Sequence, residues 1–400
     1  MFYNILDTDF YKFTTSYAAM MKFPQAEAVF EFKDRAQKKR SPEFLKVLQQ
    51  LMNDYCSGTC IRSNATQYGH NLYTEDIDWL TENVDFMPRF YWEWLDHFKL
   101  DYLRVKPWLD KDSILRFRVE DNWYKSSLYE IGCLFLTTEA QNIVDGNIEK
   151  VTKDDVIARL KPKVELANKY GLKFSEFGTR RRFSQQVQDW VCEYLAENSK
   201  TCTGTSNVYF AKKYSMKPMG THPHEFFQAH QIYGFRSMNY MALKHWSDVY
   251  QGNLGTALAD TLGTNIFLQN FTMKYAKLFD GVRQDSGDEF QFVDKFVAKY
   301  KELGIDPMTK TIIFSNALDF QKAVKIQEYC EGKIKCAFGI GTNLTNDTGF
   351  PAENIVMKMT KFRLNNREPW MDVIKISDDA GKHMGNEKLI EMAKYQLGIQ

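Results

Sequence analysis

The chain has 400 residues, 44% of them hydrophobic and 15% aromatic, which suits one large domain or two interlocked ones and excludes a disordered chain. Its formal net charge of +1 gives no general attraction to nucleic acid or to a membrane surface. The N-terminus lacks the basic start and apolar run of a signal peptide, and no stretch approaches the ~20 apolar residues of a membrane span. We therefore expect a cytoplasmic protein without nucleic-acid or membrane partners.

The first third of the chain is aromatic-rich and mixes helical and strand patterns. We expect a helix over residues 41–54 and a strand over residues 113–119, where polar and apolar side chains alternate. The seven cysteines are scattered, which suits reduced thiols. Cys56 and Cys60 are the only close pair, and no second pair or nearby histidine completes a zinc site.

From about residue 126 the pattern changes to short β-rich runs, each followed by a helical segment. The runs cover residues 173–178, 201–205, 278–283, 310–315 and 334–339. This alternation predicts parallel strands in an α/β barrel or an open sheet. Because several strand ends carry reactive side chains, an irregular (β/α) barrel is favoured, in which those ends converge on one face.

The last segment, from Asn354, indicates further strands and a final helix over residues 387–397. We expect it to return to the N-terminal region and to form a second α/β domain with it. The predicted organisation is therefore an N-terminal α/β domain (1–130), a barrel (131–345) and a C-terminal segment (346–400) that packs on the N-terminal domain.

Three of the seven histidines lie within nine residues, in what has the form of a strand end and the first turn of a helix. Residues two apart in a strand point the same way, so His222 and His224 could face one site. Pro223 places the helix start near His224, and His230 then lies about 240° further round and cannot join it as a ligand. Geometry thus disfavours zinc; a base, a phosphoryl acceptor and a packed histidine stay open.

Two further strand ends carry carboxylates. Asp260 could hold the Nδ1–H of a histidine and leave the other ring nitrogen as the nucleophile, or it could cap a helix. Arg283, Asp285 and Asp288 lie in the sequence Arg-Gln-Asp-Ser-Gly-Asp. Carboxylates around a glycine, after an arginine, suit a Mg²⁺-bound diphosphate and a ribose, and the same sequence also suits a surface turn.

Three consecutive arginines, residues 180–182, follow a strand at the start of a helix expected over residues 183–196. Positive charge at a helix N-terminus costs about 0.3–1 kcal/mol per residue, which favours an anionic ligand as the explanation. Successive helical residues diverge by about 100°, so one or two of the three can reach one ligand. We select Arg180 and leave the others for salt bridges.

A short glycine loop follows the strand that ends near Phe338. It lacks the third glycine of a dinucleotide fingerprint, and no matching acidic residue follows, so a Rossmann site is unsupported. The N–H groups of Gly341 and Thr342 could cradle a phosphate, or the segment is a plain loop. Residues 203–207 form a similar strand end of small residues with the same ambiguity.

The ordered set of these motifs is more specific than any one of them. Residues 6–12, 177–182, 204–207, 220–225, 283–288 and 338–342 together closely resemble nicotinate phosphoribosyltransferase of the bacterial type, from near Leu6 to beyond Asn354. That family makes nicotinate mononucleotide from nicotinate and phosphoribosyl diphosphate, coupled to ATP hydrolysis, in NAD salvage. The resemblance implies an irregular α/β barrel with an α/β domain from both chain ends, in homodimers with shared active sites.

The resemblance also implies residue roles. His224, in a Thr-x-x-His-Glu context with Thr221, matches a histidine that ATP phosphorylates, and Asp260 matches the carboxylate that holds it. Arg180 and Arg283 match positions that bind the pyridine acid and phosphoribosyl diphosphate. Further matches are a ribose or Mg-diphosphate contact, two aromatic faces for the pyridine and a 5′-phosphate loop: Asp285; Phe177 and, from the partner subunit, Tyr11; Gly339, Gly341 and Thr342.

Substrate choice and cofactors follow from the same resemblance. Relatives that use the neutral amide carry Asp where this chain has Ser206, and a carboxylate there would repel nicotinate. The implied co-substrate is ATP, and the implied cofactor is Mg²⁺ held through the substrate diphosphate, with Asp285 and Asp288 as nearby carboxylates. The alternatives are a nicotinamide or quinolinate phosphoribosyltransferase and, in another class, a non-catalytic metal-binding barrel built on His222 and His224.

Overall fold

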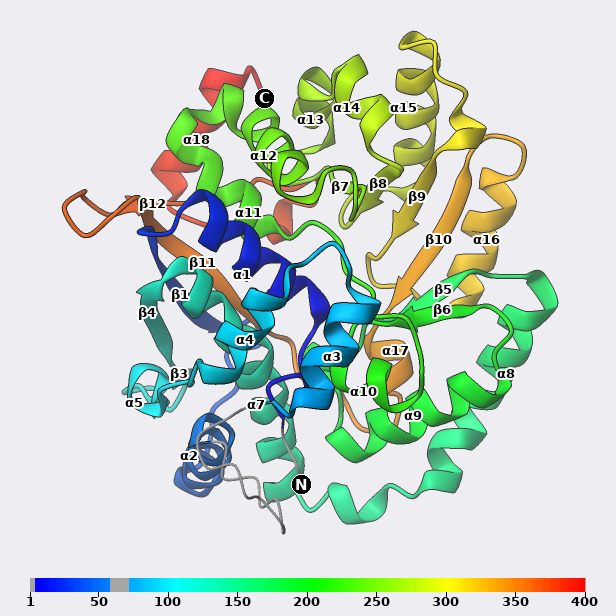
Figure 1. The fold of residues 1–400 in the computed structure, drawn as a ribbon. Helices are drawn as coiled ribbons and strands as arrows, with labels where there is room; N and C mark the ends of the chain where they lie inside the picture. Colours follow the sequence, from blue (N-terminus) through cyan, green and yellow to red (C-terminus); the bar gives the residue numbers. More distant parts are fainter. Residues whose placement is uncertain (1–3, 58–71, 400) are drawn as a thin grey trace.

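The computed structural model describes residues 4–57 and 72–399, and two sheets organise it (Figure 1). One sheet has six strands in the order β6-β5-β10-β9-β8-β7, all paired in parallel. Its strands are β5 (Phe174–Glu176), β6 (Cys202–Thr205), β7 (Thr256–Leu258), β8 (Gly281–Gln284), β9 (Thr311–Phe314) and β10 (Lys335–Ile340). The predicted parallel α/β core is confirmed. In the described part of the chain β6 and β7 form no ladder with each other, so closure into a barrel stays a prediction.

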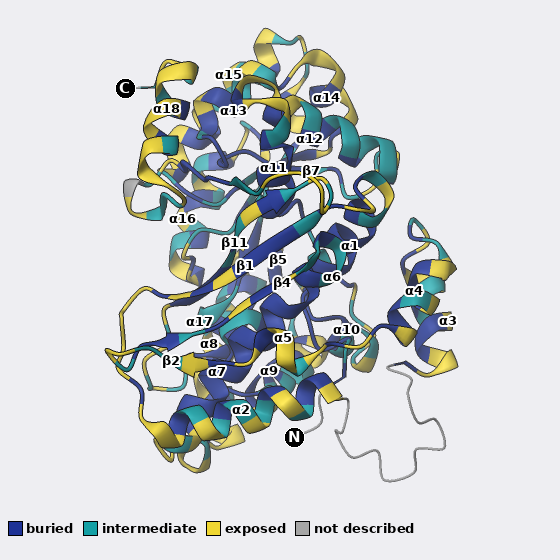
Figure 2. Cartoon of the chain, turned by 90° about the vertical axis from the view of Figure 1, so that its left-hand side faces the viewer, coloured by how far each residue is buried: buried dark blue, intermediate teal, exposed yellow. Residues whose placement is uncertain are grey.

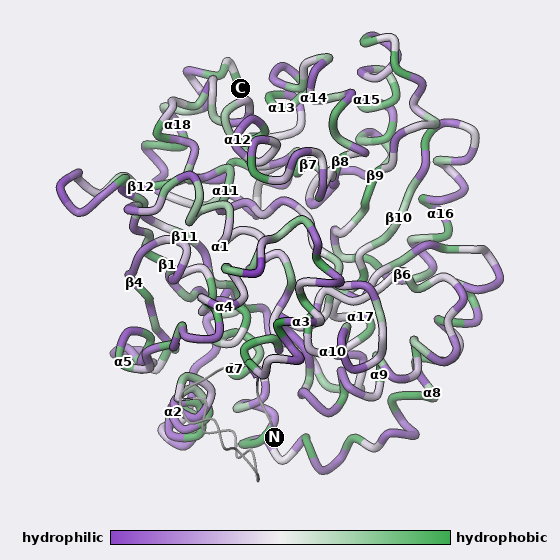
Figure 3. Tube along the Cα trace, in the orientation of Figure 1, coloured by the Kyte–Doolittle hydropathy of each residue, from purple (hydrophilic) through white to green (hydrophobic). Residues whose placement is uncertain are grey.

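Helices connect these strands, and several of them begin at polar caps. Side chains of Ser184, Asn207, Asp288 and Asp319 accept a backbone N–H at the start of their helices. The helices are α8 (Lys153–Tyr170), α9 (Gln185–Asn198), α10 (Val208–Lys213), α11 (His224–Ala229), α12 (Phe235–Tyr250), α13 (Thr264–Asn270), α14 (Met273–Leu278), α15 (Glu289–Glu302), α16 (Phe320–Cys330) and α17 (Thr342–Thr345). Hydrophobic and hydrophilic residues alternate along the outer helices, such as α8 and α15 (Figure 3).

The second sheet is antiparallel, in the order β12-β11-β1-β4. It joins β1 (Glu27–Asp34) and β4 (Arg118–Asn122) from the N-terminal segment to β11 (Ile355–Arg363) and β12 (Met371–Asp372) from the C-terminal one. β1 pairs with β11 along its whole length, and the Glu27 and Arg363 side chains form an ion pair at one end. The two ends of the chain thus share a sheet, as expected, whereas the exact domain boundaries stay a prediction.

The N-terminal segment also supplies a layer of helices around α7, which is buried over most of its length, including polar side chains such as Glu139, which pairs with Arg182. In Figure 2 the buried colour runs along β1, while α2 and α18 show exposed faces. The elements are α1 (Phe10–Lys22), α2 (Pro42–Ser57), α3 (Thr74–Asn83), α4 (Arg89–His97), α5 (Tyr102–Val105), β2 (Trp108–Leu109), β3 (Leu115–Arg116), α6 (Trp123–Ser126) and α7 (Glu130–Val144). The helix expected over 41–54 is α2, and the strand expected over 113–119 is divided into β3 and β4.

The final helix is α18 (Glu387–Leu397), as predicted, but it packs against α12 rather than against the N-terminal segment. The residues before it cross the ends of β7 and β8. There, Asp378 accepts hydrogen bonds from Thr264, and Asp379 accepts one from the Gly287 N–H. Part of the C-terminal segment therefore lies on the parallel sheet, whereas β11 pairs with β1 of the N-terminal segment.

Two expectations about the whole chain concern membrane spans and thiols. No helix within residues 4–57 and 72–399 combines the length and apolar character needed to cross a bilayer. The six cysteines in the described residues are free, and Cys60 of the close pair lies outside those residues.

Candidate active site

A cavity of about 1150 Å³ lies between the two sheets. The strand ends of the parallel sheet form one wall, and β1, β11 and the start of α1 form the other. It brings together most of the predicted site residues: Tyr11, Phe177, Arg180, Ser206, Thr221, His224, Arg283, Asp285, Gly339, Gly341 and Thr342. Asp260 lies fully buried behind His224.

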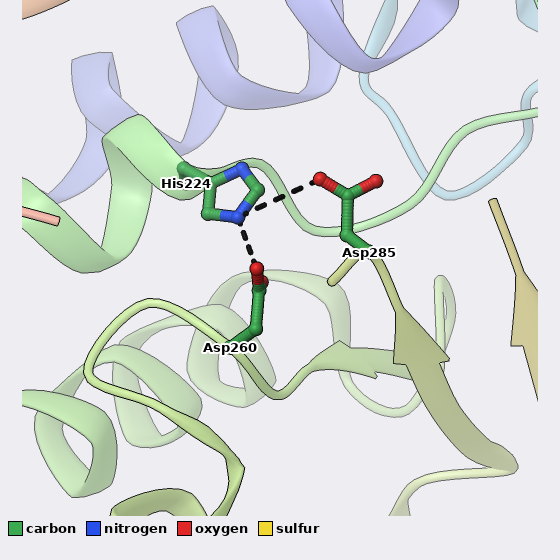
Figure 4. Close-up of side chains that lie close together, drawn as sticks. All are labelled: His224, Asp260 and Asp285. Atoms are coloured by element: carbon green, nitrogen blue, oxygen red, sulfur yellow. Dashed lines mark hydrogen bonds and ion pairs between the residues drawn. The ribbon is translucent and has the colours of Figure 1, made fainter. Parts of the chain in front are cut away.

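His224 is the first residue of α11, after the N-cap Pro223. Its Nε2 lies 2.7 Å from Asp260 Oδ1 and 3.8 Å from Asp285 Oδ2 (Figure 4). Burial and the charge of Lys375 lower the pKa of His224 to about 4, although Asp260 acts in the opposite direction. The imidazole is therefore neutral at pH 7, and its Nε2–H donates to Asp260.

This arrangement exchanges the two ring nitrogens relative to the expectation from sequence. Asp260 follows β7, and its carboxylate lies next to Nε2, the ring nitrogen further from the His224 backbone. Nδ1, expected to be bound, has no hydrogen-bond partner among the described residues. Because Nε2 carries the proton, Nδ1 carries the free lone pair.

Asp260 is a fully buried carboxylate with several partners. Burial alone would raise its pKa, but His224, Lys375 and the Ser286 hydroxyl hold the pKa well below the usual range. Ser286 Oγ donates to Asp260 Oδ2 over 2.6 Å, and Lys375 Nζ lies 3.0 Å from the same oxygen. The carboxylate is therefore ionised and held in one orientation.

His222 does not face the site beside His224, an arrangement that the spacing allowed but did not require. The segment before α11 is not a strand, so the alternation of side chains does not apply. His222 is fully buried against Phe226, Phe227 and Trp246, and within the described residues neither of its ring nitrogens has a hydrogen-bond partner. A metal site built on His222 and His224 is therefore excluded by geometry.

His230 is also away from the cavity, as its spacing predicts. Its Nδ1 donates to the Phe226 carbonyl over 2.6 Å, and its Nε2 lies 2.9 Å from His245 Nδ1. The cluster of three histidines thus separates into one that lines the cavity and two that pack in the interior.

Arg283 and Asp285 meet at the end of β8. The Arg283 guanidinium donates to Ser315 Oγ, Thr221 Oγ1 and Asp285 Oδ1 over 2.7–2.8 Å. Burial raises the pKa of Asp285, but Arg283 and His224 outweigh it and keep the carboxylate ionised. Asp288, by contrast, caps α15 through the Gln291 N–H and is not among the residues that line the cavity.

The donor set next to His224 also suits a cation. Ligand atoms of His224, Asp260 and Asp285 all lie within 4.8 Å of one another. Mg²⁺ binds through one or two carboxylates together with substrate phosphates. Asp285 fits that chemistry because its carboxylate lines the cavity, whereas both oxygens of Asp260 already have close partners.

Phe177, Tyr11 and Arg180 form the other end of the cavity. Phe177 follows β5, and Gly339 makes room for its ring, since a Cβ at Gly339 would lie 2.4 Å from Phe177 Cδ2. Tyr11 lines the cavity from α1 of the same chain, and its contribution to a partner's site stays a prediction. Its hydroxyl lies 3.5 Å from Glu130, and Arg180 Nη1 lies 4.0 Å from the same carboxylate.

The three arginines lie in or beside a separate 3₁₀ turn, Thr179–Arg181, before α9 begins at Gln185. The helix-dipole argument that singled them out is therefore wrong, although Arg180 and Arg181 do line the cavity. Arg182 is buried in ion pairs with Asp7 and Glu139, as expected for the arginines not bound to ligand. Burial and the neighbouring Arg180 lower the pKa of Arg181 to about 9.

A carboxyl group, that of Asp9, lies next to the Ser206 side chain. Its hydroxyl donates to Asp9 Oδ1 over 2.6 Å, and Asp9 also lines the cavity. The simple repulsion argument is therefore incomplete. Burial raises the pKa of Asp9, which favours its neutral form and so weakens its repulsion of an anion.

Three lysines of the cavity were missed by sequence reasoning. Lys358 lies on β11, and burial lowers its pKa to about 7. Lys375 pairs with Asp260, and Lys382 Nζ donates to the Asp285 carbonyl and to Asn316 Oδ1. All three come from the C-terminal segment, where the only local signal was the alternation of polar and apolar residues.

Comparisons with known proteins agree with this geometry. A model described as the nicotinate phosphoribosyltransferase (NAPRTase) family matches residues 172–399, and the model of its N-terminal domain matches residues 6–138. A nicotinate phosphoribosyltransferase of Chromohalobacter salexigens is 39% identical, covering 99% of this chain and 98% of its own length. One of Methanosarcina mazei is 37% identical over 100% of this chain and 98% of its own.

Solved structures show the same likeness. The crystal structure of nicotinate phosphoribosyltransferase from Porphyromonas gingivalis has a TM-score of 0.93 and 38% identity, covering 100% of both chains. That of the Vibrio cholerae protein has a TM-score of 0.89 and 30% identity, covering 100% of this chain and 95% of its own.

Proposed function

The chain belongs to the nicotinate phosphoribosyltransferase family and is an enzyme, and on this premise we propose that it couples the transfer reaction to ATP hydrolysis. The substrates are nicotinate and phosphoribosyl diphosphate, and the products are nicotinate mononucleotide and diphosphate, a step of NAD biosynthesis. ATP hydrolysis proceeds through a phosphate on His224. The expected homodimer stays a prediction.

The pyridine end of the cavity supplies orientation. The ring nitrogen of nicotinate is a weak nucleophile that needs a fixed position more than deprotonation. Phe177 and Tyr11 offer aromatic faces, and Arg180 offers a cation for the nicotinate carboxylate. Arg180 is suited to this because its nearest carboxylate, Glu130, is 4.0 Å away.

The opposite end stabilises the leaving diphosphate. Glycosyl transfer passes through a cationic sugar while negative charge builds on the departing oxygen, so fixed cations lower the barrier. Arg283 is held by three acceptors and presents its charge in one orientation. Asp285 would hold Mg²⁺ carried by the diphosphate, and the ion when bound would neutralise part of the leaving charge.

The ATP step needs no base other than the pair already in place. Neutral His224 keeps its proton on Nε2, against Asp260, so the Nδ1 lone pair attacks the γ-phosphorus. The P–O bond to ADP breaks, its electron pair leaves with ADP, and the ring becomes an imidazolium next to Asp260. The new charge biases the cavity toward a substrate-binding form, and hydrolysis of the P–N bond returns it.

The observation that carries this proposal is the His224–Asp260 pair, in which His224 lines the same cavity as Arg283 and Arg180. It is tested by incubating the enzyme with [γ-³²P]ATP and Mg²⁺. Wild type should carry an acid-labile, base-stable label, and His224→Ala should carry none. The matched control is His97→Ala, since His97 is exposed at the end of α4. A fully labelled His224→Ala enzyme would show that the assignment is wrong.

Product identification tests substrate choice. Nicotinate, nicotinamide and quinolinate are compared with phosphoribosyl diphosphate, Mg²⁺ and ATP, and the nucleotide formed is identified by mass spectrometry. Nicotinate should be the preferred substrate, because Arg180 matches one carboxylate and nicotinamide carries none. Preference for either other pyridine would replace the proposal.

A further inference from the structure

Both oxygens of Asp260 have close hydrogen-donating partners, and Ser286 and Lys375 share Oδ2. His224 Nε2 meets Oδ1, and Lys375 Nζ lies 3.0 Å from Oδ2. The Lys375 side chain is only 8% exposed, and it lines the cavity that His224 also lines. One carboxylate therefore holds the imidazole and an ammonium group at adjacent positions.

The backbone around Lys375 is fixed on both sides. The Ile374 N–H donates to Gln231 Oε1, and the Ile376 N–H donates to the carbonyl of Thr261, the residue after Asp260. Lys375 itself exchanges two backbone hydrogen bonds with Met384. The C-terminal segment thus holds Lys375 beside the end of β7, in register with Asp260.

Of the three cations at this end of the cavity, Lys375 has the fewest partners among the described residues. Arg283 is committed to Asp285, Thr221 and Ser315. Lys382 is committed to Asp379, the Asp285 carbonyl and Asn316. Lys375 shares its one carboxylate with His224, so any positive charge that develops on the imidazole competes with it for Asp260.

We propose that Lys375 binds the phosphoryl group that is transferred to His224. The proposal rests on the phosphohistidine step described above. When the P–Nδ1 bond forms, the ring becomes an imidazolium that satisfies Asp260, and the phosphoryl group adds two negative charges. The Lys375 ammonium then turns from Asp260 Oδ2 to the phosphoryl oxygens, on a flexible stem that permits the movement. Hydrolysis of the P–N bond reverses these pairings.

The test compares three variants with wild type. The first is Lys375→Met, which keeps the length of the stem and removes the charge. The second is Lys375→Arg, which keeps the charge. The third is the control Lys361→Met, at an exposed lysine of β11. For each, the rate of labelling by [γ-³²P]ATP is measured by rapid quench, and transfer without ATP is measured separately.

Removing one charge that stabilises a transferring phosphoryl group lowers the rate by about 100-fold. We therefore expect labelling of Lys375→Met to slow by about that factor and Lys375→Arg to recover at least a tenth of the wild-type rate. Transfer without ATP should fall by a smaller factor than labelling in Lys375→Met, and Lys361→Met should behave as wild type.

Three results would overturn the inference. Labelling of Lys375→Met within about threefold of wild type would show that the charge is not used. An equal fall in labelling and in ATP-independent transfer would show that Lys375 maintains the structure of the site and does not act on the phosphoryl group. Absence of label in the wild-type enzyme would instead contradict the phosphohistidine proposal itself, so the two failures are distinguishable.

Discussion

The charged side chains are paired more closely at one end of the cavity than at the other. At the His224 end each charged side chain has a close partner: Asp260 binds His224 and Lys375, and Arg283 binds Asp285. At the pyridine end Arg180 is 4.0 Å from Glu130, and Lys358 forms no ion pair among the described residues. A network whose partners are all satisfied fixes geometry, whereas a loosely paired cation is left for an anionic substrate.

Burial shows the same contrast. The carboxylates at the His224 end keep lowered pKa values despite burial, because cations surround them. At the pyridine end burial lowers the pKa of Lys358 to about 7 and raises that of Asp9, so charge there is only partly compensated. Under the proposed function, the first end stabilises the transition state and the second end binds the anionic substrate.

The largest expected effect is at the compensated end. Arg283→Ala should lower kcat of the transfer reaction about 100- to 1000-fold, because it removes a preorganised cation from the leaving diphosphate. Arg283→Lys should recover little, since a lysine cannot donate to Thr221, Ser315 and Asp285 in the same fork. Steady-state kinetics with nicotinate check this, with Arg367→Ala, at an exposed loop position, as the control. An unchanged kcat would remove Arg283 from the reaction.

A smaller effect, and one of another kind, is expected at the uncompensated end. Arg180→Met should raise the KM for nicotinate about 10- to 100-fold, the value of a charge-assisted hydrogen bond of about 1.5–3 kcal/mol. The fall in kcat should be smaller, because this contact is made equally in the ground state and the transition state. The assay varies nicotinate at saturating phosphoribosyl diphosphate. A fall in kcat with an unchanged KM would contradict the proposed division between the two ends.

Much of the parallel sheet could be predicted because several of its strands are short β-rich runs followed by a small or polar residue. The polar residues after the strands could either cap a helix or line the site, and both roles occur in the structure. Asp288 caps a helix, whereas Asp285, three residues earlier, lines the cavity. The local sequence could not distinguish these two roles, because both aspartates lie in the same turn. They differ in which residues from other parts of the chain lie opposite them.

The errors have the same physical origin. Spacing left open whether His222 faces the site, because its surroundings are set by Trp246 and Phe279, from later parts of the chain. Lys375 was overlooked because its partner, Asp260, lies far away in sequence. Ser206 was assigned without Asp9 for the same reason. Spacing predicts which face a residue takes within an element, and it cannot predict which distant element covers that face.

The smallest effect on activity is expected for His222, which packs in the interior whereas His224 lines the cavity. Replacing His222 by Phe in its aromatic surroundings should change kcat by less than about threefold, and at pH 7 the free energy of unfolding should stay within about 1 kcal/mol of wild type.

Burial lowers the pKa of His222 well below 6.5, so the unfolded chain takes up a proton there that the folded chain does not. The stability of wild type therefore falls as the pH drops below 6.5, and the variant should lose up to about 1.4 kcal/mol per pH unit of that slope. Burial also lowers the pKa of His224, to about 4, and of His230, to about 3, so their share of the slope should remain in the variant. Urea denaturation at several pH values between 5.5 and 7.5 measures the difference, and an unchanged slope would show that His222 is protonated equally in both states.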